Sequence, residues 1–457
     1  HGFIKVNIVK KVDLKNGKIS GIYFSYSVPA VIAACIFSAY SLADSVFVSR
    51  MCGPSSLSAV EICYPLLCVF SCVSVVIGTG GNVLCGIAIG KGEQNEANDV
   101  FSEVTLLITS VSLIFALTVI AFTKRFALIL GADGTVIGDV CSYLFWCGCF
   151  APFYMLSGWL FLASETAGKP GLAMISSVVS SLGNILLDWL FVVVLKRGVS
   201  GASLASGISA ALGAMIPLCY FLFADSTLRF QRVRLNIRRT GHMIYNGLSE
   251  GVSAVSTGII AFIYNIIIMK TAGSSVLADF TVALTLINFF GSLLIGASQG
   301  IAPMVSVNFG ARNYDRIKKA MKTFIGFGIM LSVAVSVFLS AFHNLISNLF
   351  KLSDGEMSGY IINAYIPVLI LSPISVIIIS YFTAIDKAGT SALLSVARTL
   401  ILRAIIIFAM LRIFGLNGVW FAAGVSEALS LMINIIAYIL HNKHYETDSV
   451  KKSVESD

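Results

Sequence analysis

Three polar side chains inside long apolar stretches have the chemistry to hold a small cation. Asp44 lies near the end of the first such stretch, in Ser-Leu-Ala-Asp-Ser-Val-Phe, and Asp188 lies well inside the fifth, in Gly-Asn-Ile-Leu-Leu-Asp-Trp. Asn184 precedes Asp188 by four residues, which places both side chains on one face of a helix. Carboxylate and amide oxygens are the ligands that a hard cation such as Na⁺ prefers, and a carboxylate binds a proton equally well.

A second carboxylate near Asp188 would strengthen this site. If Asp44 faces the same pocket, the two carboxylates repel each other and uptake of H⁺ or Na⁺ becomes favourable. The simpler alternative is a polar network that only holds the two helices together. An ionised acid near the bilayer centre costs about 2.5–3.5 kcal/mol, so we favour the functional interpretation. Asp44, Asn184 and Asp188 are the predicted metal ligands if the ion is Na⁺.

Other charged residues inside the apolar stretches have weaker patterns. Glu250 lies in the first turns of the seventh stretch, where it either reaches a cavity or is solvated at the helix end. Glu427 has Arg398 and Arg403 as expected ion-pair partners, in a structural clamp rather than a substrate contact. Three further acids lie near the ends of their stretches, where we expect water to reach them: Glu61, Glu103 and Asp279.

Enzymatic chemistry is not predicted. His242 and His343 lie at the edges of apolar stretches, and the chain has neither an HExxH motif nor an embedded Ser/His pair. All ten cysteines lie in the first half of the chain without a CxxC pair, and free cysteine packs as a small hydrophobic residue. We therefore expect no cofactor other than Na⁺ or H⁺ as a coupling ion.

The composition is that of an integral membrane protein. Hydrophobic residues make up 57% of the chain and charged residues only 12%, whereas a soluble domain has roughly 25% charged residues. Apolar runs of about 20 residues, the length that crosses about 30 Å of hydrocarbon, recur along the chain. Twelve are predicted: 21–46, 57–85, 100–123, 137–162, 169–194, 201–224, 245–270, 278–307, 320–343, 359–383, 391–412 and 418–440.

The second half of the chain repeats the first. The matching pairs are Gly80 with Gly300 and Gly90 with Gly310 at an offset of 220, Gly168 with Gly389 at 221, and Gly201 with Gly418 at 217. Six spans in each half is an even number, so the repeats have the same orientation and are related by an axis along the membrane normal. Two similar membrane lobes favour a transporter with its site between or within the lobes.

The positive charges indicate topology. The N-terminal tail, the 6–7 loop and the 8–9 region hold about half of the Lys and Arg residues, and all three lie on one side of the membrane. The positive-inside rule places this side, with both termini, in the cytoplasm of a multi-pass protein of the plasma (inner) membrane. The net charge of +8 is thereby explained without nucleic acid. We expect a monomer whose partners are membrane lipids and a small organic substrate.

The sequence predicts four segments. They are an N-terminal six-helix lobe over 1–224, a basic cytoplasmic linker over 225–244, a C-terminal six-helix lobe over 245–440 and a cytoplasmic tail over 441–457. The linker is expected to be a solvated connector, with binding of anionic lipid heads as the alternative. The tail is expected to be disordered.

Two segments and two spacings resemble the multidrug and toxin extrusion (MATE) family. Residues 44–61, with Asp-Ser-Val-Phe-Val-Ser-Arg-Met-Cys-Gly followed by Leu-Ser-Ala-Val-Glu, resemble its helix 1–2 signature. Residues 299–312, with Gln-Gly-Ile-Ala-Pro and Asn-Phe-Gly-Ala-Arg, resemble the signature of helix 8 and the 8–9 loop. The spacing of Pro29 and Asp44 and the Asn184/Asp188 pair resemble the archaeal and DinF-type branch. The resemblance covers essentially the whole chain.

The resemblance implies a V-shaped pair of six-helix bundles that exports organic compounds by alternating access, driven by Na⁺ or H⁺. It makes Asp44, Asn184 and Asp188 the first-lobe cation or proton site. Its implied neighbours are Tyr143 on the fourth helix and Ser206 on the sixth, where the family pattern leads us to expect threonine. It also makes Pro29 a hinge of the first helix. The alternatives are ordinary interhelical hydrogen bonds for Tyr143 and Ser206 and an inert kink for Pro29.

The second lobe lacks this site. The offset of 220 places Tyr264 where the first lobe has Asp44, and the offset of 221 places Ile405 and Ala409 at the positions of Asn184 and Asp188. Coupling is therefore expected in the first lobe, with Glu250 as the second-lobe acid that could reach a cavity.

The predicted function is a cation-coupled antiporter that exports cationic or amphipathic organic compounds. The alternatives are a dedicated exporter of one metabolite and a flippase for a lipid-linked precursor. A flippase would need a cavity lined by cations, for which Arg398 and Arg403 are the available residues.

Overall fold

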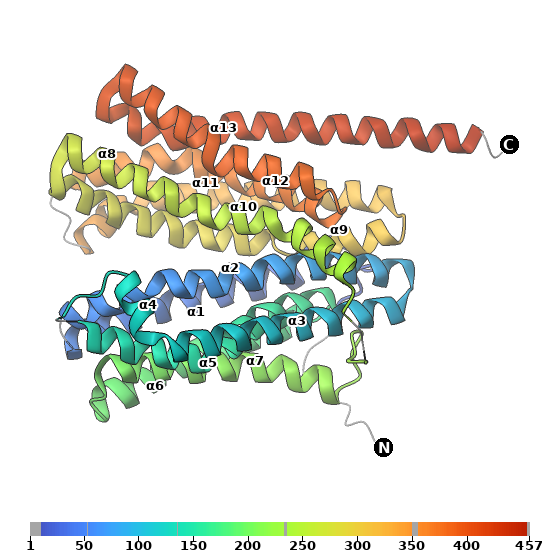
Figure 1. Cartoon of the computed structure of the whole chain (residues 1–457). Coiled ribbons are helices and arrows are strands. Elements are labelled where there is room, and N and C mark those ends of the chain that lie inside the picture. Colours follow the sequence, from blue (N-terminus) through green and yellow to red (C-terminus); the bar gives the residue numbers. More distant parts are fainter. Residues whose placement is uncertain (1–10, 53, 135, 233–234, 350–354, 455–457) are drawn as a thin grey trace. The chain divides into compact units, whose positions relative to one another are not determined.

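The protein is helical throughout its described part. The computed structural model describes residues 11–52, 54–134, 136–232, 235–349 and 355–454, and all regular structure among them is helical. Figure 1 shows the helices from α1 in blue to α13 in red. Their bounds are α1 Ile19–Cys52, α2 Pro54–Lys91, α3 Gln94–Ala121, α4 Thr123–Ile129, α5 Ile137–Thr166, α6 Pro170–Asp188, α7 Gly198–Phe223, α8 Ile237–Ser298, α9 Ile301–Gly310, α10 Tyr314–Leu349, α11 Gly355–Ala384, α12 Ala388–Val396 and α13 Leu402–Val454, with two π-helices, η1 Trp189–Val194 and η2 Ala397–Ile401. The expected all-α membrane class is confirmed.

The helices provide the twelve membrane segments that the sequence predicts. Eleven stretches of described residues are long and apolar enough to cross a membrane, and the last, Ala388–Lys443, continues through the whole of α12, η2 and most of α13. That stretch is interrupted at Gly415, where a φ of 61° breaks the helix, so it counts as two segments. The 62-residue α8 is interrupted in the same way at Gly273, with a φ of 83°.

Turn geometry confirms most of the internal repeat and corrects one part of it. Gly92 and Arg312 both have positive φ at an offset of 220, and Gly198 and Gly415 do so at an offset of 217. The turn between α5 and α6 in the first half matches the turn between α11 and α12 in the second half. These two turns, however, lie 218 residues apart rather than 221. The matching features are the positive φ of Gly168 and Asp386, the helix-start residues Lys169 and Lys387, and the amide bonds Lys169 to Ser164 and Lys387 to Phe382.

The offset of 218 changes which residues of the second half correspond to the predicted site. At an offset of 218, Asn184 and Asp188 correspond to Leu402 and Ile406, not to Ile405 and Ala409. The corrected positions also carry no acid, so the predicted difference between the halves remains.

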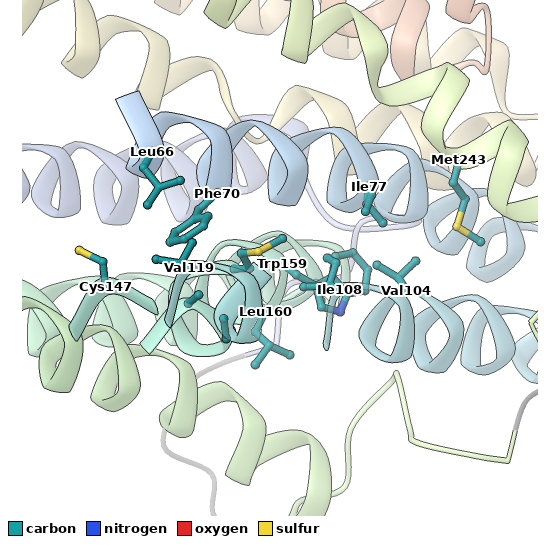
Figure 2. Packing of buried hydrophobic residues seen from close by; sticks show 14 of the residues in the cluster. Leu66, Phe70, Ile77, Val104, Ile108, Val119, Cys147, Trp159, Leu160 and Met243 are labelled. Carbon is teal, nitrogen blue, oxygen red and sulfur yellow. The ribbon is translucent and has the colours of Figure 1, made fainter. Parts of the chain in front are cut away.

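The described residues divide into two compact units, one formed from 1–251 and 302–318 and the other from 252–301 and 319–457. Figure 2 shows the core of the first, in which Phe70 and Trp159 are at most 1% exposed. The indole of Trp159 donates to Thr105 over 2.8 Å, so its polar atom is satisfied inside the core. The core of the second unit contains the fully buried Phe280 and Trp420.

Glycines hold the start of α8 and residues 302–310 of α9 against α2 in the first unit. A Cβ atom on Gly90 of α2 would lie 1.9 Å from the carbonyl oxygen of Val307 in α9, and a Cβ on Gly310 would lie 2.1 Å from that of Ile87. These two contacts are related by the internal repeat, because Gly310 lies 220 residues after Gly90 and Val307 lies 220 residues after Ile87. A Cβ on Gly247 of α8 would come equally close to α2. Only glycine permits such backbone approaches.

The N-terminal segment packs on the same unit. The amide of Val12 donates to the carbonyl of Gly168 over 2.8 Å, and the side chain of Asn308 donates to the carbonyl of Leu14 over 3.0 Å. Burial raises the pKa of Asp13, but hydrogen bonds from the backbone amides two and three residues further on outweigh burial and hold that pKa below its usual value.

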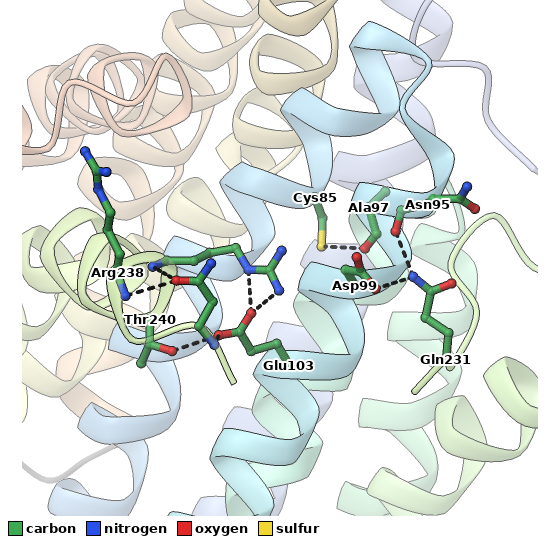
Figure 3. Close-up of polar contacts among 10 residues, drawn as sticks. Cys85, Asn95, Ala97, Asp99, Glu103, Gln231, Arg238 and Thr240 are labelled. Carbon is green, nitrogen blue, oxygen red and sulfur yellow. Dashed lines mark hydrogen bonds and ion pairs between the residues drawn. The ribbon is translucent and has the colours of Figure 1, made fainter. Parts of the chain in front are cut away.

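The linker after α7 docks on α3, which differs from the expected solvated connector. Figure 3 shows Gln231 bonded to Asp99 and to the carbonyl of Asn95. Glu103 is fully buried, pairs with Arg239 and accepts a hydrogen bond from Thr240 over 2.9 Å. The expectation that water reaches Glu103 is therefore wrong, because an arginine far along the chain takes the place of water.

Expectations for the acids Glu61 and Asp279 and for the C-terminal tail have different outcomes. The described side chain of Glu61 is exposed, as predicted, whereas that of Asp279 lies outside the described side chains. The expectation of a disordered tail after residue 440 is wrong, because α13 continues as a helix to Val454.

Candidate functional site

Asp44, Asn184 and Asp188 come together where α1 packs against α6. Asn184 is 2% exposed and Asp188 is fully buried at the last turn of α6. Asp44 is half-buried as a residue, but its Oδ1 is inaccessible to solvent. The carboxyl groups of Asp44 and Asp188 lie within hydrogen-bonding range of each other. The three residues therefore lie together at the contact between α1 and α6, and their role in ion binding stays a prediction.

The site has acceptors without donors. Oδ1 of Asp44, Oδ1 of Asn184 and both carboxylate oxygens of Asp188 are buried and accept no hydrogen bond from the described protein. The amide nitrogen of Asn184 donates to Oγ of Ser206 over 3.0 Å, which turns the amide oxygen away from Ser206 and leaves it available. Buried polar groups are rarely left unsatisfied, so this arrangement fits a bound proton or an oxygen-coordinated cation.

Tyrosines surround the acids. Tyr143, which the resemblance implies as a neighbour, is 4% exposed and lies near Asp44 and Tyr154. Two tyrosines that the sequence analysis missed also belong here. Tyr40 lies beside both Asp44 and Asp188, and Tyr154 lies beside Tyr40 and Ser206. Tyr40 precedes Asp44 by four residues, the spacing that singled out Asn184 and Asp188, so this neighbour had a signal in the sequence.

A π-helix begins directly after Asp188. The segment Trp189–Val194 is wound more widely than α6 before it, and the amide of Leu195 donates to Leu190 over 2.8 Å. Single π-turns inside helices are rare and occur frequently at functional sites, because they change the direction of neighbouring side chains. Local sequence carries no signal for such a turn, so this feature could not be predicted.

The other predicted residues are placed as follows. Pro29 lies within the continuous helix α1, where it removes the hydrogen bond to the carbonyl four residues earlier. Its role as a hinge remains a prediction. Glu250, expected as an acid of the second lobe, is half-buried in the part of α8 that belongs to the first unit, and it has partners within the protein. Its access to a cavity also remains a prediction.

The second unit contains the expected ion pair. Nε of Arg398 lies 2.7 Å from Oε1 of Glu427, and a terminal nitrogen of Arg403 lies 3.4 Å from Oε2. Arg398 also donates to Ser372 over 2.5 Å. Arg398 itself lies in the π-helix η2. Each unit thus has a charged residue at or beside a π-helix. It is the acid Asp188 before η1 in the first unit and Arg398 within η2 in the second.

The nine cysteines whose side chains are described are free thiols. Three of them contact buried polar atoms only weakly, such as Cys147 at 3.5 Å from Oγ of Ser203. Among the described residues, no group of three or more His, Cys, Asp or Glu side chains could hold a metal ion. The paired carboxylates of Asp44 and Asp188 are thus a two-acid site supplemented by an amide.

Sequence comparison supports the resemblance over both halves of the chain. A family model described as MatE matches residues 29–190 and 252–409, once in each half, and the first match ends just after Asp188. The chain belongs to the MatE family. The resemblance to the MATE family is thereby confirmed, and the protein is a multi-pass membrane transporter of this family.

Relatives and solved structures agree with this placement. Multidrug export protein MepA of Staphylococcus haemolyticus (strain JCSC1435) is 24% identical over 428 residues, which cover 92% of this chain and 93% of the relative. MepA of Staphylococcus aureus (strain NCTC 8325 / PS 47) is 22% identical over 424 residues, with the same coverage. A MATE crystal structure in complex with MaL6 superposes with a TM-score of 0.90 at 21% identity, over 96% of this chain and 99% of that chain. An outward-facing MATE transporter of the MOP superfamily gives 0.89 at 21% identity, over the same shares. These structures share the MATE fold.

Proposed function

We propose that the protein exports cationic or amphipathic organic compounds from the cytoplasm in exchange for H⁺ or Na⁺ bound at Asp44 and Asp188. One observation carries the proposal: four buried acceptor oxygens of Asp44, Asn184 and Asp188 have no donor from the described protein. A dehydrated carboxylate pair needs a positive partner, because burial without one costs several kcal/mol per charge. The multidrug export activity in the names of the staphylococcal relatives supports the substrate class.

The exchange follows from competition for negative charge. With the cation bound, Asp44 and Asp188 are neutralised and their mutual repulsion disappears. When the cation leaves, the pair regains negative charge and attracts either a new cation or a positively charged substrate. Substrate and cation therefore favour different states of the site, which is the condition for coupling their transport. Ser206 orients the amide of Asn184, and Tyr40, Tyr143 and Tyr154 supply hydroxyls beside the acids.

We also propose a membrane, an orientation and an oligomeric state for the protein. The distribution of Lys and Arg supports a plasma (inner) membrane protein with both termini in the cytoplasm. Export then runs by alternating access of the site to the two sides. We also propose that the protein acts as a monomer surrounded by membrane lipids and uses no cofactor other than the coupling ion.

The proposal is tested in proteoliposomes that contain purified protein and a lipophilic cationic dye. Na⁺ and pH gradients are imposed separately, each with the other ion balanced and the membrane potential held at zero. We expect dye movement with one of the two gradients and none without either. Dye movement at the same rate with and without both gradients would refute cation coupling.

A further inference from the structure

One charged cluster in the second unit carries a net positive charge. The cluster contains Arg398 and Arg403 but a single acid, Glu427, so its net charge is positive. The side chain of Glu427 is fully buried, and those of the two arginines are 14% and 23% exposed. An uncompensated charge inside membrane-spanning helices is unfavourable by several kcal/mol unless a counter-charge or water reaches it.

Donors in this cluster lack acceptors. Nε of Arg403 is buried and forms no hydrogen bond with the described protein. The hydroxyl of Tyr264, which is only 3% exposed, lies within hydrogen-bonding range of Tyr365, and one phenol of such a pair keeps a proton to donate to a ligand. The charge of Arg403 acts on both Tyr264 and Tyr365, so these groups are neighbours. The ring of Phe280 contacts Tyr264 at 5.3 Å between centroids.

A third donor belongs to the same aromatic group. The ring of Trp420 contacts that of Phe280 at 5.3 Å between centroids. Trp420 is fully buried, and its indole nitrogen also has no acceptor in the described protein. An arginine, a phenol and an indole nitrogen thus occupy one region of the second unit. A guanidinium and a phenol are the donors that proteins commonly use to bind carboxylates and phosphates.

The chemistry is the opposite of that in the first unit. There, Asp44 and its neighbours offer acceptors without donors, which fits a cation. Here, Tyr264 occupies the position of Asp44 in the internal repeat, and the unsatisfied groups are donors beside a positive charge. The group that would satisfy both the hydrogen bonds and the charge is an anion.

We propose that Arg403 and Tyr264 form a binding site for an oxyanion, a carboxylate or a phosphate, in the second unit. Glu427 holds the two arginines in place and leaves one positive charge for the ligand. If the proposed export function is correct, the substrates include amphoteric compounds that carry an acidic group as well as a cationic one. A purely structural Arg–Glu–Arg clamp would bind no anion.

The test is ligand-induced thermal stabilisation of the purified full-length protein in a neutral detergent, with chloride kept low. The probes are benzoate, its uncharged analogue benzyl alcohol, inorganic phosphate and chloride. A ligand that binds only the folded protein raises the unfolding temperature in proportion to its saturation, which gives an apparent affinity. We expect benzoate, phosphate or both to stabilise the protein, and benzyl alcohol to have no comparable effect. Benzoate alone would identify a carboxylate site, and phosphate alone a site for phosphate groups such as lipid heads.

Substitutions of Arg403 and Tyr264 test whether the oxyanion binds at these two residues. Arg403→Gln removes the charge, and Tyr264→Phe removes only a hydroxyl, so it tests the site even if Arg403→Gln does not fold. Each is expected to weaken oxyanion binding at least tenfold, because one strong hydrogen bond is lost (about 1.4 kcal/mol per tenfold). Arg412→Gln, an exposed arginine on the same helix, is the matched control and should bind as the wild type does. Stabilisation by chloride alone, no stabilisation at all, or full affinity in both variants would overturn the inference.

The outcome is separable from that of the proposed function. Asp188→Asn should retain oxyanion binding because it alters only the first unit. Gradient-driven dye export without oxyanion binding would refute the second-unit site and leave cation coupling in place. Oxyanion binding without gradient-driven export would support the second-unit site and refute cation coupling.

Discussion

Asp44 and Asp188 face each other with acceptor oxygens only, and that arrangement defines the role proposed for them. Their hydrogen-bonding range and burial make a shared proton or a bound cation the natural complement. Neither residue is held by an arginine or lysine in any ion pair among the described residues. The pair therefore differs from Glu103, whose charge is neutralised by Arg239 and which serves the fold.

Replacing Asp44 by asparagine should abolish gradient-driven export while leaving folded protein in the membrane. The substitution keeps the side-chain shape but removes the charge that competes for cation and substrate. Dye efflux from proteoliposomes measures the effect, and we expect a loss of at least about tenfold, as for removal of one essential charge–charge contact. Asp139→Asn, an exposed acid at the start of α5, is the control and should export normally. Wild-type efflux from well-folded Asp44→Asn protein would contradict the assignment.

Much of this site could be predicted from the sequence, because hydrocarbon makes buried acids conspicuous and the four-residue spacing reveals a shared helix face. Tyr154 could not be predicted, since its proximity to Ser206 depends on how α5 packs against α7. Glu103 was misread for a similar reason. Its partner Arg239 lies more than a hundred residues away, so the local sequence shows only an acid near the end of an apolar run.

The helices themselves are largely determined by apolar run length. The predicted span 57–85 corresponds to α2, Pro54–Lys91, which extends further because a membrane helix does not stop at the edge of the hydrocarbon. The repeat offset between the fourth and fifth helices was wrong by three residues, because matching small residues in a helix fit several alignments, whereas a left-handed turn fits one. The π-helices η1 and η2 had no signal in the sequence.

Alanine at Gly90 should destabilise the contact between α2 and α9. Its methyl group would lie 1.9 Å from the Val307 carbonyl, so the two helices must separate, at a cost of about 1–3 kcal/mol. Gly326→Ala in α10 is the control. No atom lies within 4 Å of its added Cβ, and alanine stabilises a helix by about 0.5–1 kcal/mol relative to glycine. The unfolding temperatures of the two variants should therefore shift in opposite directions. Equal shifts would show that α2 and α9 are not packed through glycine.

Glutamine at Glu103 should loosen the linker from α3. The change leaves Arg239 without its counter-charge and weakens the bonds to Asn236 and Thr240, with an expected loss of about 1–3 kcal/mol. Glu93→Gln is the matched control, because its pair with Lys91 is half exposed at 3.6 Å and such pairs contribute about 0–1 kcal/mol. Trypsin cleavage in the linker, at Arg238 or Arg239, reports the difference. Equal cleavage rates in the two variants would show that the clamp does not hold the linker.

The whole chain is a duplicated structure whose halves have diverged in charge. Turns at offsets of 220, 218 and 217 preserve the repeat, while the polar residues inside the helices do not follow it. The candidate site of the first unit is built on the acids Asp44 and Asp188, whereas the charged cluster of the second unit has two arginines and one acid. Duplication explains the common fold, and the divergence explains why a cation and an acidic group would each have a site of their own.

The central claim is that the coupling cation binds at Asp44 and Asp188, and direct binding tests it most plainly. Radioactive Na⁺ binding and proton release are measured on purified wild-type protein, Asp188→Asn and Glu250→Gln. Asp188→Asn should lose binding of the coupling ion, whether Na⁺ or H⁺, while Glu250→Gln keeps the wild-type affinity. Full affinity in Asp188→Asn together with loss in Glu250→Gln would place the site at Glu250 and contradict the account.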